Sequence, residues 1–312
     1  MTVHGILNLL KPRGMTSMDA VRRVKRLTRE RSVGHGGTLD PLATGVLPIL
    51  FGQASRMMDI IIEGRKVYRG VVRLGLTTDT YDVAGKVLAT ADPSGVTREQ
   101  VEGVLQRFIG LITQVPPAYS ALKMEGERLY ERARRGEPVQ PKPRRVRIFR
   151  LEVLEWEPPT FTLEIECGRG VYIRSLAHDI GQALGSGAVL QSLERLRAGP
   201  FRWEEAVTLD AFAQAVADGT WRGLLYPPDY VVRHLKAAIL GPLTSRMVGQ
   251  GQDIPLGRRG LLLAQHGEVC RLYSAEGGFL GLARYDSGKG RWHPEKVFAL
   301  PAEEDAPLPL RQ

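Results

Sequence analysis

The sequence predicts a mixed α/β chain with a second, smaller β-rich part toward its C-terminal end. Segments with alternating apolar residues, typical of strands, recur between segments with apolar residues every three or four positions, typical of helices. After about Tyr230 the helical spacing fades, and glycines separate short apolar runs. With 312 residues, the chain is long enough for one large domain and one small one.

The first predicted elements are a strand over His4–Leu10, a turn at Pro12–Gly14 and then a helix. Thr16 and Asp19 have the spacing of a capping box, which marks the start of that helix. Its buried face is expected to carry the four apolar residues that recur every third position: Met18, Val21, Val24 and Leu27.

The rest of the chain alternates between predicted loops, strands and helices. Glycines are dense in Gly34–Leu47, which predicts a loop held inside the fold. Strands are expected over residues 66–75 and, paired around a turn at Pro158-Pro159, over Val146–Trp156 and Thr160–Cys167. Helices are expected over Thr97–Phe108, from near Glu127, and over Ile173–Leu184, Leu190–Leu196 and Leu209–Ala217.

The composition excludes several classes of protein. The apolar fraction of 43% is that of a globular chain, which argues against wholesale disorder. The longest apolar runs are too short to span a bilayer, and the N-terminus lacks the pattern of a signal peptide. The two cysteines, Cys167 and Cys270, form no disulfide framework, as expected for a cytoplasmic protein.

The positive charge is concentrated in two segments. The net charge of +9 comes from 43 Lys and Arg against 34 Asp and Glu. Residues 11–31 carry eight cations against two acids, and residues 123–150 carry ten against four. Arginine, whose planar fork suits phosphate, provides 34 of the cations. Two such blocks favour a nucleic-acid partner, although arginine-rich codon usage and solvated surfaces explain the same counts.

The residues match no common cofactor motif, and one carboxylate stands out. The six histidines lack metal-ligand spacing, and the glycine-dense segment matches neither the P-loop nor G-x-G-x-x-G, so we expect no metal and no cofactor. Asp40 is a candidate nucleophile or base, because Leu39 and Leu42 would partly desolvate it. The simpler interpretation is that Asp40 caps a helix beginning at Pro41.

The segment Gly168–Leu176 offers a partner for Asp40. A strand passes into a helix there, and Tyr172 and Arg174 lie near the junction. Arg174 is able to pair with a carboxylate through its planar fork, and Tyr172 is able to stack on a base. The alternatives are a surface arginine and a core tyrosine.

Six motifs follow one another in a fixed order along the chain. They are NLLKPRGMTS at residues 8–17, GHGGTLDPLATGVL at 34–47, KVY at 66–68 with TTDTYD at 77–82, QVPPAYSALK at 114–123, GVYIRSLAHDIG at 170–181 and LERLRAGPF at 193–201. In this order they resemble the motifs of the bacterial tRNA pseudouridine-55 synthases, the TruB family. The region that ends in WHPEKVF at 292–298 resembles PUA-type RNA-binding domains.

The resemblance implies a pseudouridine-synthase fold within the α/β class. That fold has a central mixed, largely antiparallel sheet flanked by helices, followed by a small PUA-like β-barrel. The implied organisation is a synthase domain over residues 1–235 with an RNA-binding insertion at about 114–145, a PUA-like domain over 240–300 and a disordered tail over 301–312.

The resemblance also implies chemistry that needs neither cofactor nor metal. Pseudouridine synthases break the N-glycosidic bond of a flipped-out uridine, turn the base and rejoin it through C5. Asp40 is implied as the nucleophile, which attacks either uracil C6 or ribose C1′, and Arg174 as the partner that keeps it ionised. Tyr68 is implied to stack on the uracil and to assist proton removal from C5. The other implied substrate-binding residues are His35, in the space vacated by the flipped nucleotides, and Tyr172 and Leu193, which line the base pocket.

The implied partner is the T-arm of tRNA, with the modified uridine in the T-loop. We expect a monomer without membrane contact. Two alternatives remain open: a related synthase that acts on rRNA with a guide RNA, and a catalytically silent tRNA-folding chaperone or RNA-binding protein. Five cations from the basic segments are expected to hold the RNA backbone: Lys11, Arg128, Arg134, Arg144 and Arg145.

Overall fold

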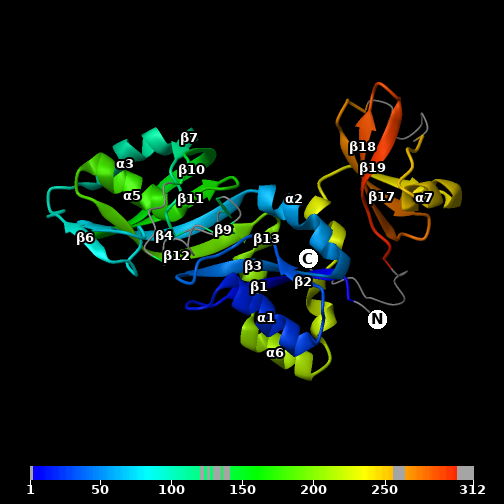
Figure 1. Cartoon of the computed structure of the whole chain (residues 1–312), viewed down its shortest axis with the longest axis horizontal. Helices are drawn as coiled ribbons and strands as arrows, with labels where there is room; N and C mark the ends of the chain where they lie inside the picture. The colour runs from blue at the N-terminus through cyan, green and yellow to red at the C-terminus, as the bar shows by residue number, and fades with distance from the viewer. Residues whose placement is uncertain are drawn as a thin grey trace.

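An eleven-stranded mixed sheet forms the centre of the larger part of the chain (Figure 1). The computed structural model describes residues 3–119, 123–124, 127–128, 135, 141–255 and 264–300. The main strand order is β14-β1-β3-β12-β4-β11-β10-β7, while β2, β13 and β15 pair with β3, β12 and β1. The bounds are β1 (Gly5–Lys11), β2 (Val33–His35), β3 (Ala43–Phe51), β4 (Lys66–Leu74), β7 (Gly110–Gln114), β10 (Arg144–Glu157), β11 (Thr160–Cys167), β12 (Ala188–Ala198), β13 (Phe201–Arg202), β14 (Val207–Thr208) and β15 (Leu225–Tyr226).

Most neighbouring strands in this sheet are antiparallel. The two parallel pairs are β1 with β14 and β3 with β12. Because β3 lies between β1 and β12, its side chains are almost all buried. The predicted α/β class with a mixed, largely antiparallel sheet flanked by helices is confirmed.

Strand β12 replaces a predicted helix and is the largest correction to the sequence analysis. The segment Leu190–Leu196 was expected to be helical, but it lies between β3 and β4 in the middle of the sheet. Two register shifts against β4, at Leu190/Ser192 and at Arg195/Arg197, break the alternation that identifies a strand. Burial between two strands therefore overrides the local helical pattern.

The helices gather beside the two halves of the sheet (Figure 1). Helix α5 (Ile173–Leu184) packs on β12 and β4, with α3 (Arg98–Leu105) beside it, whereas α1 (Ser17–Thr28) and α6 (Leu209–Ala217) lie near β1. All four confirm predicted helices, although the segment predicted up to Phe108 ends in a 3₁₀ turn. None of the described helices is long and apolar enough to cross a membrane.

Helix α1 begins as predicted but buries a different face. Thr16 and Asp19 form the reciprocal capping box. The buried residues of the helix are Ser17, Ala20, Val21 and Val24, while Met18 is 44% exposed, so the assignment of Met18 to the buried face is wrong. The buried residues Ser17, Ala20, Val21 and Val24 follow the mixed spacing of three and four of a helix face, whereas the prediction used a strict spacing of three.

The insertion between β7 and β10 begins differently from the prediction. Glu127–Arg128, expected at the start of a helix, form the short strand β9, which pairs with β8 (Lys123–Met124). Two-residue strands leave no periodic pattern by which a sequence could reveal them. The rest of this predicted helix lies outside the described residues, apart from Arg135.

The C-terminal part contains a separate four-stranded sheet, which confirms its predicted β-rich character. The strand order is β16 (Ala237–Leu240), β17 (Val269–Ser274), β18 (Phe279–Asp286) and β19 (Arg291–Val297). Within the described residues, the four strands pair side by side in this order, and the first strand does not pair with the last to close a barrel. Helix α7 (Pro242–Gly249), which no sequence pattern predicted, covers the sheet. The predicted disordered tail over 301–312 lies outside the described residues.

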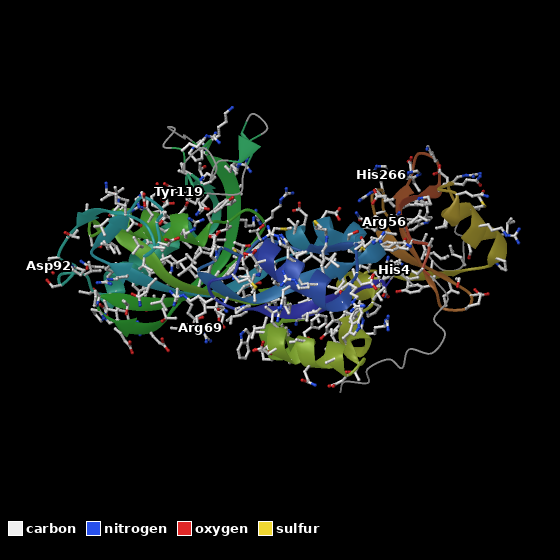
Figure 2. All side chains as sticks on the ribbon, turned by 60° about the horizontal axis from the view of Figure 1, so that its bottom comes forward. His4, Arg56, Arg69, Asp92, Tyr119 and His266 are labelled. Carbon is white, nitrogen blue, oxygen red and sulfur yellow. The ribbon has the colours of Figure 1, made fainter. Side chains whose placement is uncertain are left out.

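The C-terminal sheet is docked against the larger part. Phe279, Leu282 and Phe298 share one apolar cluster with Ile6 and Leu50 of the central sheet. Around this cluster, Lys296 pairs with Asp59 at 2.9 Å, and Gln53 exchanges hydrogen bonds with the backbone of Ala299. Arg56, which lies beside the C-terminal part in Figure 2, donates to the carbonyl of Val297. The predicted domain boundaries at 235 and 240 stay a prediction.

Gly181 on α5 makes the closest approach of that helix to β12. A Cβ at this position would overlap the backbone of Gly187 and Ala188. We expect Gly181→Ala to lower the free energy of unfolding by about 1–3 kcal/mol, because either the helix or the strand must move. Urea denaturation measures this change.

Gly103→Ala is the matched control for that measurement. Gly103 lies inside α3 with no atom within 4 Å of the site of a Cβ. There alanine should raise the free energy of unfolding by about 0.5–1 kcal/mol, since it only removes backbone freedom from the unfolded chain. Equal effects of the two substitutions would contradict the close packing of α5 on β12.

Candidate active site

Asp40 lies in a short loop that connects β2 to β3. The loop is shorter than predicted, because Gly34 and His35 belong to β2 and residues from Ala43 onward to β3. No helix begins at Pro41, so the interpretation of Asp40 as a helix cap is wrong. Asp40 is thus free for another role, with its side chain 41% exposed.

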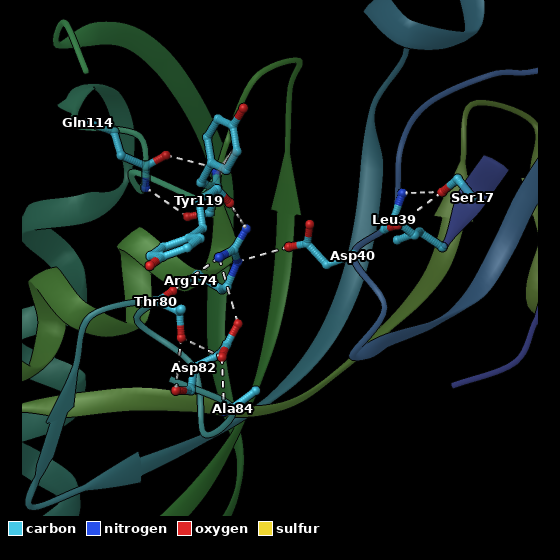
Figure 3. Close-up of polar contacts among 10 residues, drawn as sticks. Ser17, Leu39, Asp40, Thr80, Asp82, Ala84, Gln114, Tyr119 and Arg174 are labelled. Atoms are coloured by element: carbon cyan, nitrogen blue, oxygen red, sulfur yellow. Dashed lines mark hydrogen bonds and ion pairs between the residues drawn. The ribbon is translucent and has the colours of Figure 1, made fainter. Parts of the chain in front are cut away.

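The backbone on both sides of Asp40 is tied to the first motif. The buried hydroxyl of Ser17 accepts a hydrogen bond from the Leu39 amide at 2.8 Å and donates to the Leu39 carbonyl at 3.0 Å (Figure 3). The amide of Gly14 donates to the carbonyl of Pro41 at 2.8 Å. These bonds hold the loop without using the carboxylate of Asp40.

Arg174, from the first turn of α5, pairs with Asp40 as the sequence suggested. Arg174 Nε lies 2.9 Å from Asp40 Oδ2, and the arginine side chain is only 6% exposed (Figure 3). The alternative of a surface arginine is therefore wrong. The ion pair therefore has one buried and one accessible partner, and the accessible partner is the carboxylate.

The remaining donors of Arg174 are directed at two other segments. Nη1 donates to the carbonyl of Thr80 at 3.1 Å, and Nη2 donates to the carbonyl of Tyr119 at 3.0 Å. Asp82 adds a second carboxylate, with its Oδ2 3.7 Å from Nη1. These contacts fix the plane of the guanidinium and leave it one orientation toward Asp40 (Figure 3).

Asp82 is itself held by the polar loop 77–85. Its Oδ1 accepts from the Thr80 hydroxyl at 2.7 Å and from the Ala84 amide at 3.0 Å. This loop contains the motif TTDTYD at 77–82, but no sequence pattern assigns Asp82 a role. Its contact with Arg174 spans 92 positions, and nothing local in the sequence reports it.

Tyr68 lies on β4 below the loop that carries Asp40. Its ring is buried, and burial raises the pKa of its hydroxyl above the ordinary value of 10.0, although the charge of Arg195 and a hydrogen bond from it oppose part of that shift. The nearby charge of Asp40 also raises this pKa, so the two side chains share one electrostatic environment. Tyr68 is therefore a neutral phenol at neutral pH.

The other predicted pocket residues lie around these three. Leu193 on β12 is buried opposite Gly70 of β4. Half-buried His35 accepts a hydrogen bond from the Gly37 amide, and burial lowers its pKa. The backbone of Tyr172 is clamped by the buried side chain of Gln114, which bonds both its amide and its carbonyl (Figure 3).

The predicted RNA-binding cations do not all lie at the surface. Lys11 is fully buried, and its ammonium donates to the carbonyls of Pro12 at 2.8 Å and Met15 at 2.6 Å. Its assignment as a surface contact for RNA is therefore wrong. Burial, partly offset by the charge of Asp40, lowers the pKa of Lys11 to about 8. Arg144 and Arg145 on β10 are exposed as expected, whereas Arg134 and the side chain of Arg128 lie outside the described residues.

Sequence reasoning missed Ser17, Gln114 and Arg195 as parts of this site. Arg195 is 1% exposed and lies on β12 beneath the Asp40 loop. Its segment was misread as a helix, and only a strand places Leu193 and Arg195 on the same inward face. Across the described residues, no group of three or more His, Cys, Asp or Glu side chains is arranged to hold a metal ion.

Family models match most of the chain that carries this site. The model described as TruB family pseudouridylate synthase (N terminal domain) matches residues 25–173, and that described as tRNA pseudouridylate synthase B C-terminal domain matches residues 174–233. The chain belongs to the TruB family of pseudouridylate synthases. Asp40 and Tyr68 fall in the first match, while Arg174 and Leu193 fall in the second.

Curated TruB-family relatives match over most of their length and are named tRNA pseudouridine synthase B. A relative from Dehalococcoides mccartyi is 39% identical, with 96% of this chain and 98% of the relative aligned. One from Ralstonia nicotianae is 42% identical over 96% and 95% of the two chains. One from Gloeobacter violaceus is 47% identical over 81% and 87%.

Solved structures resemble the TruB-family chain over both of its parts. A chain of an H/ACA RNP bound to a substrate RNA containing 2′-deoxyuridine aligns with a TM-score of 0.71 and 25% identity, covering 96% of this chain and 86% of that one. A chain of a Cbf5-Nop10-Gar1 complex aligns with a TM-score of 0.71 and 27% identity, covering 94% and 84%. These alignments extend into the C-terminal sheet, beyond the family models.

Asp179 on α5 gives a pH-dependent test of the surroundings of Arg174. The preceding residue, His178, stacks its ring on Tyr81 at a centroid distance of 4.0 Å. Burial raises the pKa of the Asp179 carboxyl from 3.8 to about 6. The folded protein therefore binds a proton more tightly than the unfolded chain between these values, so this group lowers stability as pH rises from about 4 to 6. We expect Asp179→Asn to raise the melting temperature relative to the parent at pH 7.5.

Thermal unfolding of Asp179→Asn and the parent over pH 4–8 checks this expectation. The advantage of the variant should shrink as pH falls through 6 and become constant below about 4, where both states of the parent are protonated. Asp92→Asn, at an exposed position, is the control. A stability difference that does not change with pH would contradict the burial of the Asp179 carboxyl.

Proposed function

We propose that this chain isomerises uridine to pseudouridine in the T-loop of tRNA, with Asp40 as the nucleophile. The observation that carries the proposal is the 2.9 Å ion pair between the half-exposed Asp40 and the buried Arg174, in a chain of the TruB family. Relatives named tRNA pseudouridine synthase B, aligned over most of both chains, support tRNA as the substrate.

The reaction needs no added atoms. The bond from uracil N1 to ribose C1′ breaks, the base turns, a new bond joins C5 to C1′, the proton on C5 leaves, and N1 gains a proton. Asp40 attacks either uracil C6 or ribose C1′ and is released at the end. In this proposal Arg174 orients the attacking carboxylate, and because the arginine is buried, solvent screens its charge little.

Neighbouring residues bind the base in this proposal. Tyr68 stacks on the extruded uracil; because its pKa is raised, the neutral phenol favours stacking over abstraction of the C5 proton. Tyr172 and Leu193 line the pocket, and His35, whose lowered pKa favours the neutral ring, fills the space left by the flipped nucleotide. A loop uridine is cheaper to extrude than a paired one, which supports the T-loop as the target.

The RNA backbone is expected to lie along the exposed cations of residues 123–150, with Arg144 and Arg145 as contacts, together with the insertion residues Arg128 and Arg134. We assign the synthase role to residues 1–235 and an additional RNA contact to the PUA-like part at 240–300. Asp40, Arg174 and Tyr68 come from one chain, so a monomer suffices, and we expect it to act in the cytoplasm.

Two other functions predict different behaviour. The H/ACA chains named above align at 25–27% identity, whereas the tRNA synthases reach 39–47%, which favours the tRNA enzyme over a synthase that depends on a guide RNA. A silent chaperone would not need the Asp40–Arg174 pair. Both alternatives predict no turnover on tRNA alone.

Tritium release from tRNA tests the proposal. An unmodified tRNA transcript with tritium at uridine C5 should lose label from one T-loop uridine without guide RNA or cofactor. Asp40→Asn should slow release on the order of 10⁴-fold or more, because it removes the nucleophile while keeping its size. Asp92→Asn, at an exposed position outside the site, should release label at the parent rate. Tight binding by the parent without release would exclude the enzyme and favour the chaperone.

Salt dependence tests the RNA-binding face. Replacing both Arg144 and Arg145 by alanine should weaken tRNA binding and reduce the slope of log K against log salt by about 1 for each lost phosphate contact. The control replaces Arg98 and Arg107, two exposed cations outside the basic segments. An unchanged slope in the first variant would mean that Arg144 and Arg145 are solvated surface residues that do not contact RNA phosphates.

A further inference from the structure

Arg195 is the most deeply buried arginine of the site, and its guanidinium ends against the backbone of the Asp40 loop. It is 1% exposed on β12. Nε donates to the carbonyl of Val46 at 2.7 Å, Nη2 to that of Gly37 at 3.1 Å and Nη1 to that of Thr38 at 3.5 Å. One side chain therefore holds backbone on both the strand that leads away from Asp40 and the loop that leads up to it.

The same side chain is a cross-strand neighbour of Tyr68. In the antiparallel pairing of β12 with β4, Arg195 stands directly opposite Tyr68, so their side chains share one face of the sheet. The charge of Arg195 lowers the pKa of the Tyr68 hydroxyl, against the larger effect of burial. Arg195 thus links the strand that carries Tyr68 to the loop that carries Asp40.

The packing around Arg195 leaves its backbone no other register. Arg195 pairs with Gly45 in the parallel ladder of β12 and β3. Gly45 has φ +103°, and a Cβ there would overlap the backbone of Arg195. This left-handed glycine is what allows the two strands to approach closely enough for the guanidinium to reach the loop carbonyls.

The charge of Arg195 has no carboxylate partner within 4.0 Å among the residues that the structure describes. Arg174, by contrast, lies between Asp40 and Asp82. A buried guanidinium bound mainly to carbonyl oxygens is expensive to maintain for stability alone, because no opposite charge offsets its desolvation. A positioning task explains why an arginine rather than an apolar residue occupies this place.

We propose that Arg195 is a positioning residue for the reaction, which sets the Asp40 loop at its working distance from Tyr68. Among the described residues it forms no hydrogen bond or ion pair with the Asp40 carboxylate, so it acts through the loop backbone and the tyrosine. This inference rests on the proposed function for its kinetic consequence. Lysine cannot replace it, because a single ammonium lacks the planar fork that reaches Val46, Gly37 and Thr38 together.

Arg195→Lys is the test, with Arg197→Lys as the matched control. Arg197 lies on the same strand, is 31% exposed at its side chain and pairs with Glu166 at 2.8 Å, away from the loop. Single-turnover tritium release at saturating tRNA should fall about 100-fold in Arg195→Lys, while the tRNA dissociation constant changes less than about threefold, since misplacement acts on the chemical step. Arg197→Lys should match the parent in both measurements.

Hydrogen exchange supplies a readout that a general loss of stability would not produce. Amides of residues 36–47 should exchange faster in Arg195→Lys, while those of β10 and β11 keep their parent rates. Faster exchange throughout the sheet, a rate within about threefold of the parent, or a loss confined to tRNA affinity would each overturn the proposal.

Two further arms keep the outcomes separate. If Arg195→Lys does not fold, Arg195→Gln, which buries no charge, is measured instead, with the same expected changes in tritium release and tRNA affinity. Failure of both variants to fold would overturn the positioning role and assign Arg195 a role in folding. If the parent protein releases no tritium, the proposed function fails, while local exchange at residues 36–47 still decides whether Arg195 holds the loop. If the parent is active and Arg195→Lys is equally active, only this inference fails.

Discussion

The candidate site depends on one buried guanidinium. Arg174 is almost without solvent contact, and its donors reach Asp40, Thr80 and Tyr119, which belong to three segments far apart in the sequence. A buried charge is costly without hydrogen bonds and an opposite charge beside it, so the ion pair depends on the place of each of these segments. The Asp40 carboxylate, whose side chain is 41% exposed, is the more accessible partner of this ion pair.

The central sheet makes this arrangement possible by placing β3 and β12 side by side and parallel. Their pairing brings the end of the Asp40 loop next to Leu193 and Arg195. Antiparallel β4 on the other side of β12 brings Tyr68 to the same face. The three parts of the pocket are thus set by strand order, whereas α5 adds Arg174 from outside the sheet.

The sequence is informative wherever the signal is local or carried by a motif. The capping box of Thr16 and Asp19 and the paired strands β10 and β11 follow from spacing alone. Asp40 and Arg174 are candidates from their local sequence, and the resemblance to the TruB family assigns their roles and adds Tyr68. The sequence fails where distant contacts decide. Bulges against β4 hid the strand character of β12, and with it the inward face of Arg195. Lys11 was counted as a surface cation because a charge count assumes exposure.

Burial divides the cations of this basic chain into two kinds. Lys11, Lys66, Arg174 and Arg195 are each at most 6% exposed, and their donors are bound mostly to backbone carbonyls of the chain itself. Arg144 and Arg145 are exposed, and in the described contacts their side chains bind no backbone carbonyl. Salt screens the exposed charges strongly and the buried ones little, so RNA affinity and the geometry around Asp40 respond to different conditions. A net charge of +9 therefore overstates the positive surface available to a polyanion, because some of the cations are buried and hold the backbone around the candidate site.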